Sequence, residues 1–466
     1  MHQAAAPTPV AAPRLVVLNR PLAASLGLDA DALASDDGAA IFSGNRLPPG
    51  ASPLAQAYAG HQYGHFTTLG DGRAILLGEQ ITPNGSRFDI QLKGPGPTPF
   101  SRRGDGRAAL GPMLREHLIS EAMHALGIST TRCLAVAASG ENVYRETPLP
   151  GAVLTRVAAS HIRVGTFEWA AAQRDDAITR SLVDYTLRRH YPELADVENP
   201  SAALLNAVIE RQAALIARWM LVGFVHGVMN TDNMAVSGET IDYGPCAFMD
   251  AYDPMTVFSS IDARGRYAYG NQPAVALWNL TRLAETLVPV LHVEEARAIT
   301  LATESLGHFA SRYQHHWLAG MRRKLGLFTE ELEDTALSES LFAWMLQTKA
   351  DFTNTFAGLA RTSSVGGPPL TDSEFLQWHD RWLARLERQP QSPMQSDELR
   401  RANNPVFIPR NHLVEAALAA AEQDDLSVME RLLDVLATPY DHTREAPGYR
   451  QPAPASFADY QTFCGT

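Results

Sequence analysis

The sequence predicts an α+β fold in two lobes, a small β-rich lobe followed by a large helical lobe. Up to about residue 157 the chain is rich in Gly and Pro and carries short apolar runs of strand length. After about residue 158, apolar side chains recur at helical spacing. A polar loop over roughly 226–273 follows a strongly apolar helix, and ligands commonly bind in the cleft between two such units.

Composition and charge narrow the class of protein. The 466 residues include 51 acidic and 39 basic side chains, a net charge of −12, with 45% hydrophobic residues. That balance fits a globular protein with a sizeable core and argues against a binder of nucleic acid or of anionic membranes. Three scattered cysteines predict neither a zinc site nor a disulfide framework, and no uninterrupted apolar stretch reaches ~18 residues. We therefore expect a cytoplasmic protein that binds no nucleic acid and no membrane.

The first lobe is expected over 14–157, after an Ala/Pro-rich segment, 1–13, that we expect to form a flexible tail. The elements expected in this lobe are strands at 74–79 and 88–93, a Gly/Pro-rich loop at 94–106, and a helix at about 111–126, where Leu114, Leu118, Ala122 and Leu126 repeat at spacing four.

The second lobe is expected over 158–466 and is mainly helical. It contains the polar loop and a C-terminal extension. The expected segments are a strongly apolar helix at 203–225 and amphipathic stretches at 274–292, 296–325, 339–358, 373–388 and 411–437.

A glycine-rich turn and a strand lysine are the first chemical signals. In LGDGRAILLGE, Gly70 and Gly72 would let backbone amides approach a phosphate, and Arg73 adds a charged donor. Lys93 closes the second strand, where protein kinases place the lysine that contacts nucleotide phosphates. A surface role is the usual explanation for a strand lysine, but only three of the 39 cationic residues are lysines. That scarcity favours a functional role for Lys93.

In protein kinases a helix glutamate pairs with the strand lysine. Both Glu116 and Glu121 lie at the borders of the apolar arc of the helix at 111–126. Periodicity therefore leaves the choice between them open.

The segment HGVMNTDN, 226–233, has the spacing of a kinase catalytic loop. A short apolar strand, MAV, and a turn, SGET, are expected to follow it and to lead into IDYG. Aligned on His226 and Asn233, Asp242 falls on the metal-binding aspartate of kinases. An amide and a carboxylate oxygen beside phosphate suit Mg²⁺, so Asn233 and Asp242 are the predicted metal ligands.

The same alignment lacks the usual catalytic base. The kinase aspartate falls on Val228, which cannot accept a proton, and a carboxylate appears instead at Asp232. The residues alone therefore indicate a protein-kinase-like nucleotide and metal site without the ordinary phosphotransfer base.

At this point the chain resembles the selenoprotein O (SelO/YdiU) family, kinase-like pseudokinases that transfer AMP to proteins. The resemblance covers nearly the whole chain and rests on AQAYAGHQYGHF (55–66), LGDGRAILLGE (69–79), DIQLKGPGPTPFSRRGDGR (89–107), SEAMHALGISTTR (120–132), VLTRVAASHIRVGTFE (153–168), HGVMNTDNM (226–234), DYGPCAFMDAYDP (242–254), NPVFIPRNHL (404–413) and the terminal FCGT.

The resemblance implies a bilobal kinase-like fold with family-specific extensions, in which ATP binds in inverted orientation. Glu116 would be the partner of Lys93, Asn233 and Asp242 would hold Mg²⁺ or Mn²⁺, and Asp232 would accept the proton of the protein hydroxyl. The implied nucleotide-binding residues are Gly70, Gly72, Arg73, Lys93, Asp105, Gly106, Arg156, Arg163 and Asp242.

One departure from the family concerns redox control. Some members place a cysteine after DAYDP that can form a disulfide with the C-terminal cysteine, but here that segment carries Phe258 and Ser259. Control through that bridge is therefore not expected. Cys464 remains as a cysteine, and Cys246 is a candidate substitute partner.

The function expected from the resemblance is AMPylation, the transfer of AMP from ATP to Ser, Thr or Tyr hydroxyls of proteins with release of pyrophosphate. Redox-related proteins are implied as substrates only by the family. The alternatives are UMPylation from UTP with Mn²⁺, or a non-catalytic nucleotide-binding scaffold. Retention of Lys93, Asp232, Asn233 and Asp242 argues against a scaffold, and Val228 argues against a small-molecule kinase.

Overall fold

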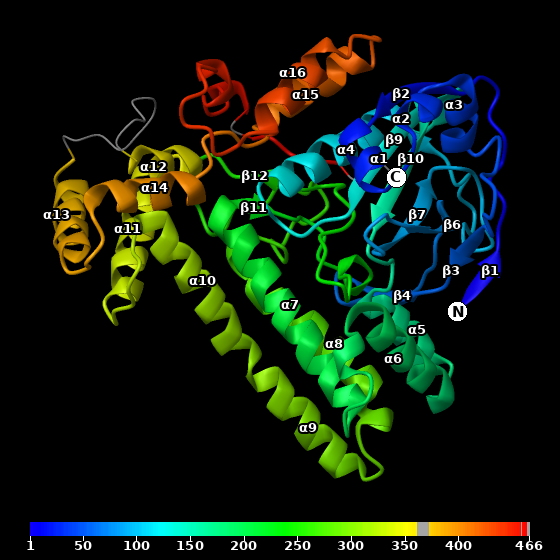
Figure 1. Cartoon of the computed structure of the whole chain (residues 1–466), viewed down its shortest axis with the longest axis horizontal. Helices are drawn as coiled ribbons and strands as arrows, with labels where there is room; N and C mark the ends of the chain where they lie inside the picture. Colours follow the sequence, from blue (N-terminus) through cyan, green and yellow to red (C-terminus); the bar gives the residue numbers. More distant parts are fainter. Residues whose placement is uncertain (361–371, 458, 464–466) are drawn as a thin grey trace.

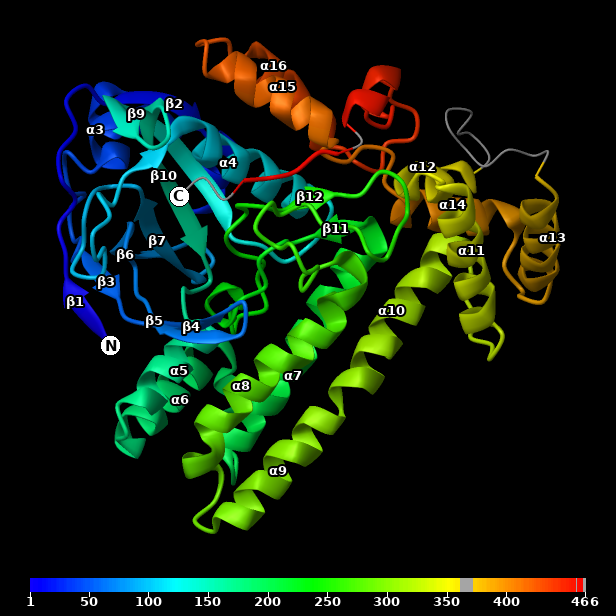
Figure 2. The ribbon, with the colours of Figure 1, turned by 180° about the vertical axis from the view of Figure 1, so that it is seen from behind.

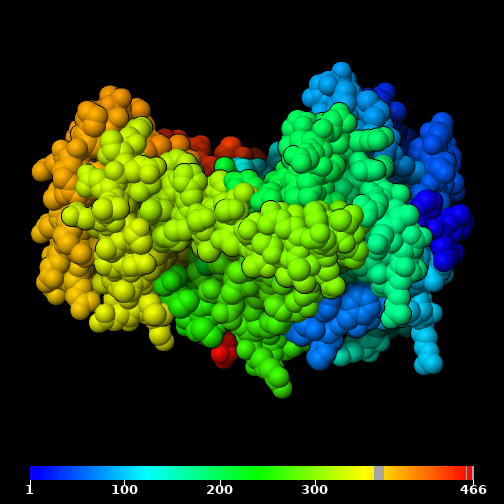
Figure 3. Space-filling view, turned by 90° about the horizontal axis from the view of Figure 1, so that it is seen from below, coloured from blue at the N-terminus to red at the C-terminus, as the bar shows by residue number. Residues whose placement is uncertain are grey.

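The computed structural model describes residues 1–360, 372–457 and 459–463 and has an α+β architecture (Figure 1). One sheet occupies the N-terminal third, and helices make up most of the rest. Seen from below, the blue N-terminal third lies at one end and the yellow and orange helices lie at the other, with green segments between them (Figure 3).

The sheet carries the strand that ends in Lys93. Its order is β1-β3-β6-β7-β10-β9-β2, with the short β8 paired to β10, and all the pairings in it are antiparallel. In the central strand β7, Lys93 lies opposite Ala74 of β6 and Leu154 of β10. The strands are β1 (His2–Ala4), β2 (Arg14–Leu18), β3 (Leu54–Gln56), β6 (Ala74–Ile81), β7 (Arg87–Lys93), β8 (Ala108–Ala109), β9 (Arg132–Tyr144) and β10 (Pro148–Ala158).

The N-terminal segment is not the flexible tail that its composition predicts. Residues His2–Ala4 form β1 and pair with β3, and Val10 is buried. The expectation for 1–13 is wrong because the open edge of β3 offers backbone hydrogen bonds that compensate the entropy of ordering the segment.

Helix α4 (Leu110–Ala125) lies beside the sheet and confirms the helix expected at about 111–126. Leu114, Leu118 and Ala122 are buried, as the spacing of four requires. The C-terminal hairpin of helices α15 (Asn411–Ala421) and α16 (Ser427–Leu436) covers the other side of α4 (Figure 2). The C-terminal extension therefore holds α4 against the sheet.

The helical part is built around α7 (Pro200–Val222) and α8 (Gln272–Leu291), which pack against each other. Among the described residues, one helix, Tyr269–Leu291, is long and apolar enough to cross a membrane, with 56% of its window buried in the structure. The other helices are α1 (Arg20–Ser25), α2 (Ala30–Leu33), α3 (Asp36–Ser43), α5 (Val164–Ala172), α6 (Asp176–His190), α9 (Glu295–Gly307), α10 (Phe309–Leu325), α11 (Asp334–Thr348), α12 (Phe352–Gly358), α13 (Ser373–Glu387) and α14 (Pro393–Asn403).

Three of the predicted amphipathic stretches are each two helices. The stretch at 296–325 breaks at His308, and the stretch at 339–358 breaks after Lys349, whose φ of 52° ends α11 in the left-handed region. The stretch at 411–437 breaks near Asp424, which also has a positive φ. Periodicity missed these breaks because apolar spacing continues across a tight turn when both helices pack on one core.

The polar loop after α7 is held in place by short elements. Strands β11 (Phe224–Val225) and β12 (Ala247–Phe248) pair at its base, with short 3-10 helices at Thr231–Asn233 and Tyr269–Asn271. The strand predicted at 234–236 is absent, and Ala235 forms only an isolated bridge with Arg163. A turn begins at Val236 and is closed by the Gly238 N–H, which donates to Ala235 O at 3.1 Å, so the extended stretch ends before a ladder forms.

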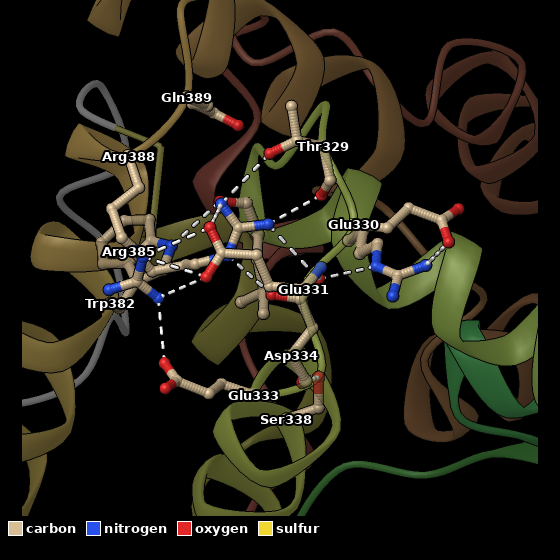
Figure 4. A network of polar contacts seen from close by, with 12 residues as sticks. Thr329, Glu330, Glu331, Glu333, Asp334, Ser338, Trp382, Arg385, Arg388 and Gln389 are labelled. Carbon is tan, nitrogen blue, oxygen red and sulfur yellow. Dashed lines mark hydrogen bonds and ion pairs between the residues drawn. The ribbon is translucent and has the colours of Figure 1, made fainter.

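A buried ion cluster joins α11 to α13 far from the sheet (Figure 4). Asp334 and Arg385 are both 1% exposed, with Arg385 Nε 2.7 Å from Asp334 Oδ1. Arg322 Nε donates to the other carboxylate oxygen at 2.7 Å. Arg388 and Glu331 form a second, more exposed pair at 2.7 Å beside this cluster.

We predict that Asp334→Ala lowers the free energy of unfolding by about 3–5 kcal/mol. It removes the carboxylate that Arg322 and the buried Arg385 share, and leaves Arg385 with only the less buried Glu331, at 3.1 Å. Chemical denaturation measures the change. The matched control, Arg388→Ala, removes a more exposed pair and should leave the free energy of unfolding nearly unchanged. Equal effects of the two variants would contradict a special role for the buried cluster.

Candidate functional site

Asp242 is the centre of the predicted site, and its carboxylate binds three cations. Lys93 Nζ lies 2.8 Å and an Arg156 terminal nitrogen 2.5 Å from Asp242 Oδ1, and an Arg163 nitrogen lies 3.0 Å from Oδ2. Burial alone would raise the pKa of Asp242, but Arg156, Lys93 and Arg163 outweigh it and hold that pKa well below its ordinary value. The carboxylate is therefore charged at every physiological pH.

Glu116 on α4 is the second carboxylate of this cluster. It accepts hydrogen bonds from Lys93 Nζ at 2.6 Å and from an Arg156 terminal nitrogen at 2.5 Å. Glu121 instead forms a two-bond pair with Arg132, at 2.7 and 2.6 Å. The structure thus decides in favour of Glu116, as the resemblance implied, where helical periodicity could not.

The cluster concentrates buried charges of both signs. Three cations, Lys93, Arg156 and Arg163, face the two carboxylates of Glu116 and Asp242, and all except Asp242 are at most 6% exposed. Asp71 and Asp232 also lie close enough to Arg163 for its charge to oppose the rise in their pKa values. The carboxylates hold the three cations together, and several cationic donors grouped in this way suit phosphate groups.

Two hollows share Arg73 in their lining, and one of them reaches this cluster. That one, of about 410 Å³, is lined by Lys93 and Glu116 on one side and by the C-terminal residues Tyr460 and Thr462 on the other. The second, of about 300 Å³, is lined by the remaining predicted residues of the glycine turns, namely Gly70, Gly72, Asp105 and Gly106. The glycine turns thus border the cluster only through Arg73.

The backbone geometry requires glycine at positions 70 and 106. Gly70 has φ 128° and a Cβ there would overlap the ring of Phe100, while Gly106 has φ 65° and a Cβ would overlap the backbone of Gly96. Asp105 pairs with Arg145 at 2.9 Å, and a side-chain hydrogen bond from that arginine lowers the pKa of Asp105. Asp105 is therefore a charged group at the rim of the second hollow.

His226 is a structural part of the loop that aligns with the kinase catalytic loop. It is fully buried, stacks on Trp219 with ring centroids 5.2 Å apart, and its Nε2 lies 3.0 Å from the carbonyl oxygen of Ile241. Burial lowers its pKa, so the ring is neutral and Nε2–H is the donor. His226 thereby fixes the backbone directly before Asp242, which has a left-handed φ of 64°.

Asp232 lies in the 3-10 turn beneath a hairpin made of β4 (Ala59–Gln62) and β5 (His65–Thr68). A Cβ at Gly60 would overlap Asp232 Oδ1, so glycine is needed for the hairpin to approach this closely. Asp232 Oδ1 is buried and makes no hydrogen bond among the described residues. Burial, partly opposed by Arg163, raises the pKa of Asp232 to about 6.

Sequence reasoning missed the residues that hold this turn. Glu168 on α5 accepts from Thr231 Oγ1 at 2.7 Å and lies 2.5 Å from His61 Nδ1, and the His61 backbone N–H donates to Thr231 Oγ1 at 2.7 Å. The motif at 55–66 was the only sign in the sequence that this segment has a special role. Periodicity could not show that it packs on a loop some 170 residues away.

The predicted metal ligands fit a divalent cation by their chemistry. The side-chain nitrogen of Asn233 donates to the Val228 carbonyl at 2.9 Å. Its side-chain oxygen is therefore the atom that a cation would bind. Asp242 Oδ2 accepts one bond, from Arg163, and so retains a lone pair. Two oxygen ligands plus phosphate and water are the environment that Mg²⁺ prefers. No group of three His, Cys, Asp or Glu residues suited to a metal occurs in the described part of the chain.

The segment that carries Ser259 lies beside the C-terminal residues of the described chain. Thr462 N donates to Phe258 O at 2.8 Å, and Ser260 N donates to Thr462 O at 3.0 Å. Cys464 lies outside the described residues. Cys246 is a buried free thiol whose pKa burial raises to about 12.

The family model described as "Protein adenylyltransferase SelO" matches residues 2–437 of the chain. The chain belongs to the SelO family. A "Protein nucleotidyltransferase YdiU" of Alkaliphilus metalliredigens is 61% identical over 461 residues, covering 99% of this chain and 94% of that relative. Proteins of the same name from Bacillus cytotoxicus and Syntrophotalea carbinolica are 60% and 61% identical over 461 residues, with the same coverage. These matches confirm the resemblance that the motifs carry.

Asp232 provides a test of the site's electrostatics in this SelO-family chain. Its carboxyl binds a proton more tightly in the folded chain, so this contribution favours folding below the ordinary pKa of 3.8 and is lost as pH rises through about 6. We predict that Asp232→Asn raises the free energy of unfolding at pH 8 by up to about 3 kcal/mol and changes it little at pH 4. Denaturation without nucleotide or metal at both pH values measures this.

Asp105→Asn is the matched control for Asp232→Asn. The pKa of Asp105 is lowered instead of raised, so its substitution should give no gain at pH 8. A lower free energy of unfolding for Asp232→Asn than for the unchanged chain at pH 8 would contradict the inference that burial destabilises the charged Asp232 carboxylate.

Proposed function

We propose that this chain transfers AMP from ATP to Ser, Thr or Tyr hydroxyls of proteins and releases pyrophosphate. Nucleotide transfer to protein is supported by the SelO family description and by the names of the YdiU relatives. The observation that carries the finer proposal is a group of three buried cations beside a carboxylate, Asp232, that stands where kinases have no base.

We further propose that the chain has a bilobal kinase-like arrangement. Its support is the sequence of parts: a lysine strand, β7, a helix glutamate bonded to that lysine, and a buried histidine loop leading to Asp242. Strand β7 lies between β6, which precedes it in the chain, and β10, which follows α4 and β9. These parts would hold a nucleotide between the sheet and the helical region.

In this mechanism Lys93, Arg156 and Arg163 bind the triphosphate and stabilise the charge that develops on the leaving pyrophosphate. Arginines suit this role because each presents several donors in a fixed plane. Asn233 and Asp242 would hold Mg²⁺, or Mn²⁺, which when bound neutralises phosphate charge and orients the oxygens. Arg73 and the glycine turns would close around the remaining phosphate oxygens.

Asp232 is the proton acceptor in the proposed reaction. The substrate hydroxyl oxygen forms a bond to the α-phosphorus, the bond from that phosphorus to the bridging oxygen of pyrophosphate breaks, and the hydroxyl proton passes to Asp232. A pKa of about 6 leaves the carboxylate charged at neutral pH and basic enough to accept a proton. Val228, at the usual position of the base, is buried, with 8% exposed.

Labelling experiments also test two alternative functions, transfer of UMP from UTP and nucleotide binding without catalysis. UTP could replace ATP, with Mn²⁺, because the phosphate-binding residues do not read the base. Competition between ATP and UTP under each metal discriminates the two. A nucleotide-binding scaffold would bind ATP and modify no protein.

We predict that label from α-phosphate-labelled ATP enters protein and that label from γ-labelled ATP does not. Asp242→Ala should reduce the transfer by about 100-fold or more, because it removes a metal ligand and unbalances three buried cations. Gel autoradiography of protein mixtures measures both. Transfer from the γ position alone would overturn the proposal.

We predict that the rate of transfer rises as pH increases through about 6, because Asp232 must lose its proton to act as the base. Asp232→Asn should lower kcat by roughly 100-fold or more while nucleotide binding is retained. The remaining activity should lack the inflection near pH 6. An unchanged inflection in the variant would assign the titration to another group.

A further inference from the structure

A surface beside Asp232 has the features of a binding site for the protein that receives the nucleotide. We call it the hairpin face: the hairpin residues His61, Gly64 and Phe66, with Arg266 from the polar loop and Trp278 from α8. None of these side chains has a role in binding the nucleotide in the proposed function.

The hairpin runs along the catalytic loop in register. Gly60 lies against Asp232, the His61 N–H bonds Thr231, and the Tyr63 N–H bonds Asn230 Oδ1 at 3.1 Å. From Gly60 to Tyr63 the hairpin therefore follows the loop from Asp232 back to Asn230, away from the proposed proton acceptor.

Arg266 lies at the far end of this line. A Cβ built on Gly64 would be 3.8 Å from the Arg266 guanidinium carbon. The next residue, Tyr267, donates its hydroxyl to Asn230 Oδ1 at 2.6 Å, which anchors the loop. Because Gly60 and Gly64 are four residues apart, at most ~14 Å of backbone separates the two ends. An extended acceptor peptide crosses that span in at most about four residues.

The Arg266 guanidinium has no carboxylate partner among the described residues. It lies over the Trp278 ring, 4.7 Å from the centroid, and its Nε is buried without a hydrogen bond. The nearest acid in sequence, Asp262, uses its oxygens to accept the backbone N–H groups of Arg266 and Tyr267. The Arg266 side chain also interacts with the Tyr267 hydroxyl, so its position is fixed. A guanidinium placed over an aromatic ring, with no carboxylate bonded to it, is a typical receptor for a carboxylate.

Arg282 offers a contrast on the same tryptophan. Its guanidinium carbon lies 5.0 Å from the Trp278 centroid, but it forms an ion pair with Glu285 at 2.7 Å. Arg282 is therefore already neutralised, and Arg266 is the cation left for a partner.

An aromatic surface connects Arg266 to the region of Asp232. The His61 ring contacts Phe66 and Trp278 edge to face, each with centroids 5.4 Å apart, and Phe66 is 48% exposed. Glu168 holds His61 at 2.5 Å from behind. Such a fixed, half-exposed aromatic platform suits the apolar part of a peptide chain.

We propose that Arg266 binds the carboxylate of an Asp or Glu that lies about four residues from the acceptor hydroxyl in the protein substrate. The proposal rests on the proposed function and names its substrate class. Since the chain carries a net charge of −12, it does not attract acidic proteins by its overall field, so this preference is local to Arg266.

The test uses the full-length chain, α-labelled ATP, Mg²⁺ and synthetic peptides with one hydroxyl. One peptide carries Glu four residues from the hydroxyl, a second carries Gln there, and a third carries Lys. For the unchanged chain we expect kcat/KM for the Glu peptide to exceed that for the Gln peptide by about tenfold. Arg266→Gln should reduce this ratio to near one, and Arg266→Glu should favour the Lys peptide.

Arg282→Gln is the matched control, because it removes a cation from the same tryptophan that is already paired. It should keep the Glu preference of the unchanged chain. Nucleotide affinity, measured by calorimetry, should be the same for all variants, which shows that each is folded. Failure to label any peptide would count against the proposed function itself. Labelling without a Glu preference, or a preference that survives Arg266→Gln, would overturn the role of Arg266.

Discussion

The buried carboxylate of Asp242 is the group on which the rest of the site depends. Its three cations come from strand β7, strand β10 and the start of α5, so one side chain connects the sheet to the helical region. Without it, Lys93, Arg156 and Arg163 would repel one another in a medium of low dielectric constant. Asp242 also adopts a left-handed backbone conformation, which costs roughly 1–2 kcal/mol and is held by the neighbouring contact from His226 to Ile241.

The positions of the other charges follow from that centre. Glu116 bonds two of the cations, Lys93 and Arg156, while Arg163 also interacts with Asp71 and Asp232. Asp232 receives no comparable compensation, so burial leaves its pKa raised. Two carboxylates close in sequence are therefore kept in opposite electrostatic states by their surroundings, one charged at all times and one able to exchange a proton near neutrality. Such separation of pKa values is characteristic of functional sites.

The hairpin of β4 and β5 gives the site its second side. It covers Asp232, excludes water from it through the close approach of Gly60, and presents His61 and Phe66 outward. Asp232 thus has the hairpin on one side, through Gly60, and also interacts with Arg163 of the cation cluster. The proposed transfer from a small molecule to a protein would use this arrangement, because donor and acceptor must both reach one proton acceptor.

The sequence by itself determined the α+β class, the strand ending in Lys93, the helix of Glu116, and the loop that carries Asp232, Asn233 and Asp242. These features depend on local spacing and on residue chemistry, which one chain displays directly. Only the tertiary structure decided between Glu116 and Glu121, ordered the first residues on the sheet edge, and placed His61, Glu168 and Arg266 beside the catalytic loop. Those outcomes depend on contacts between segments up to about 200 residues apart, and no periodicity records which distant surfaces will meet.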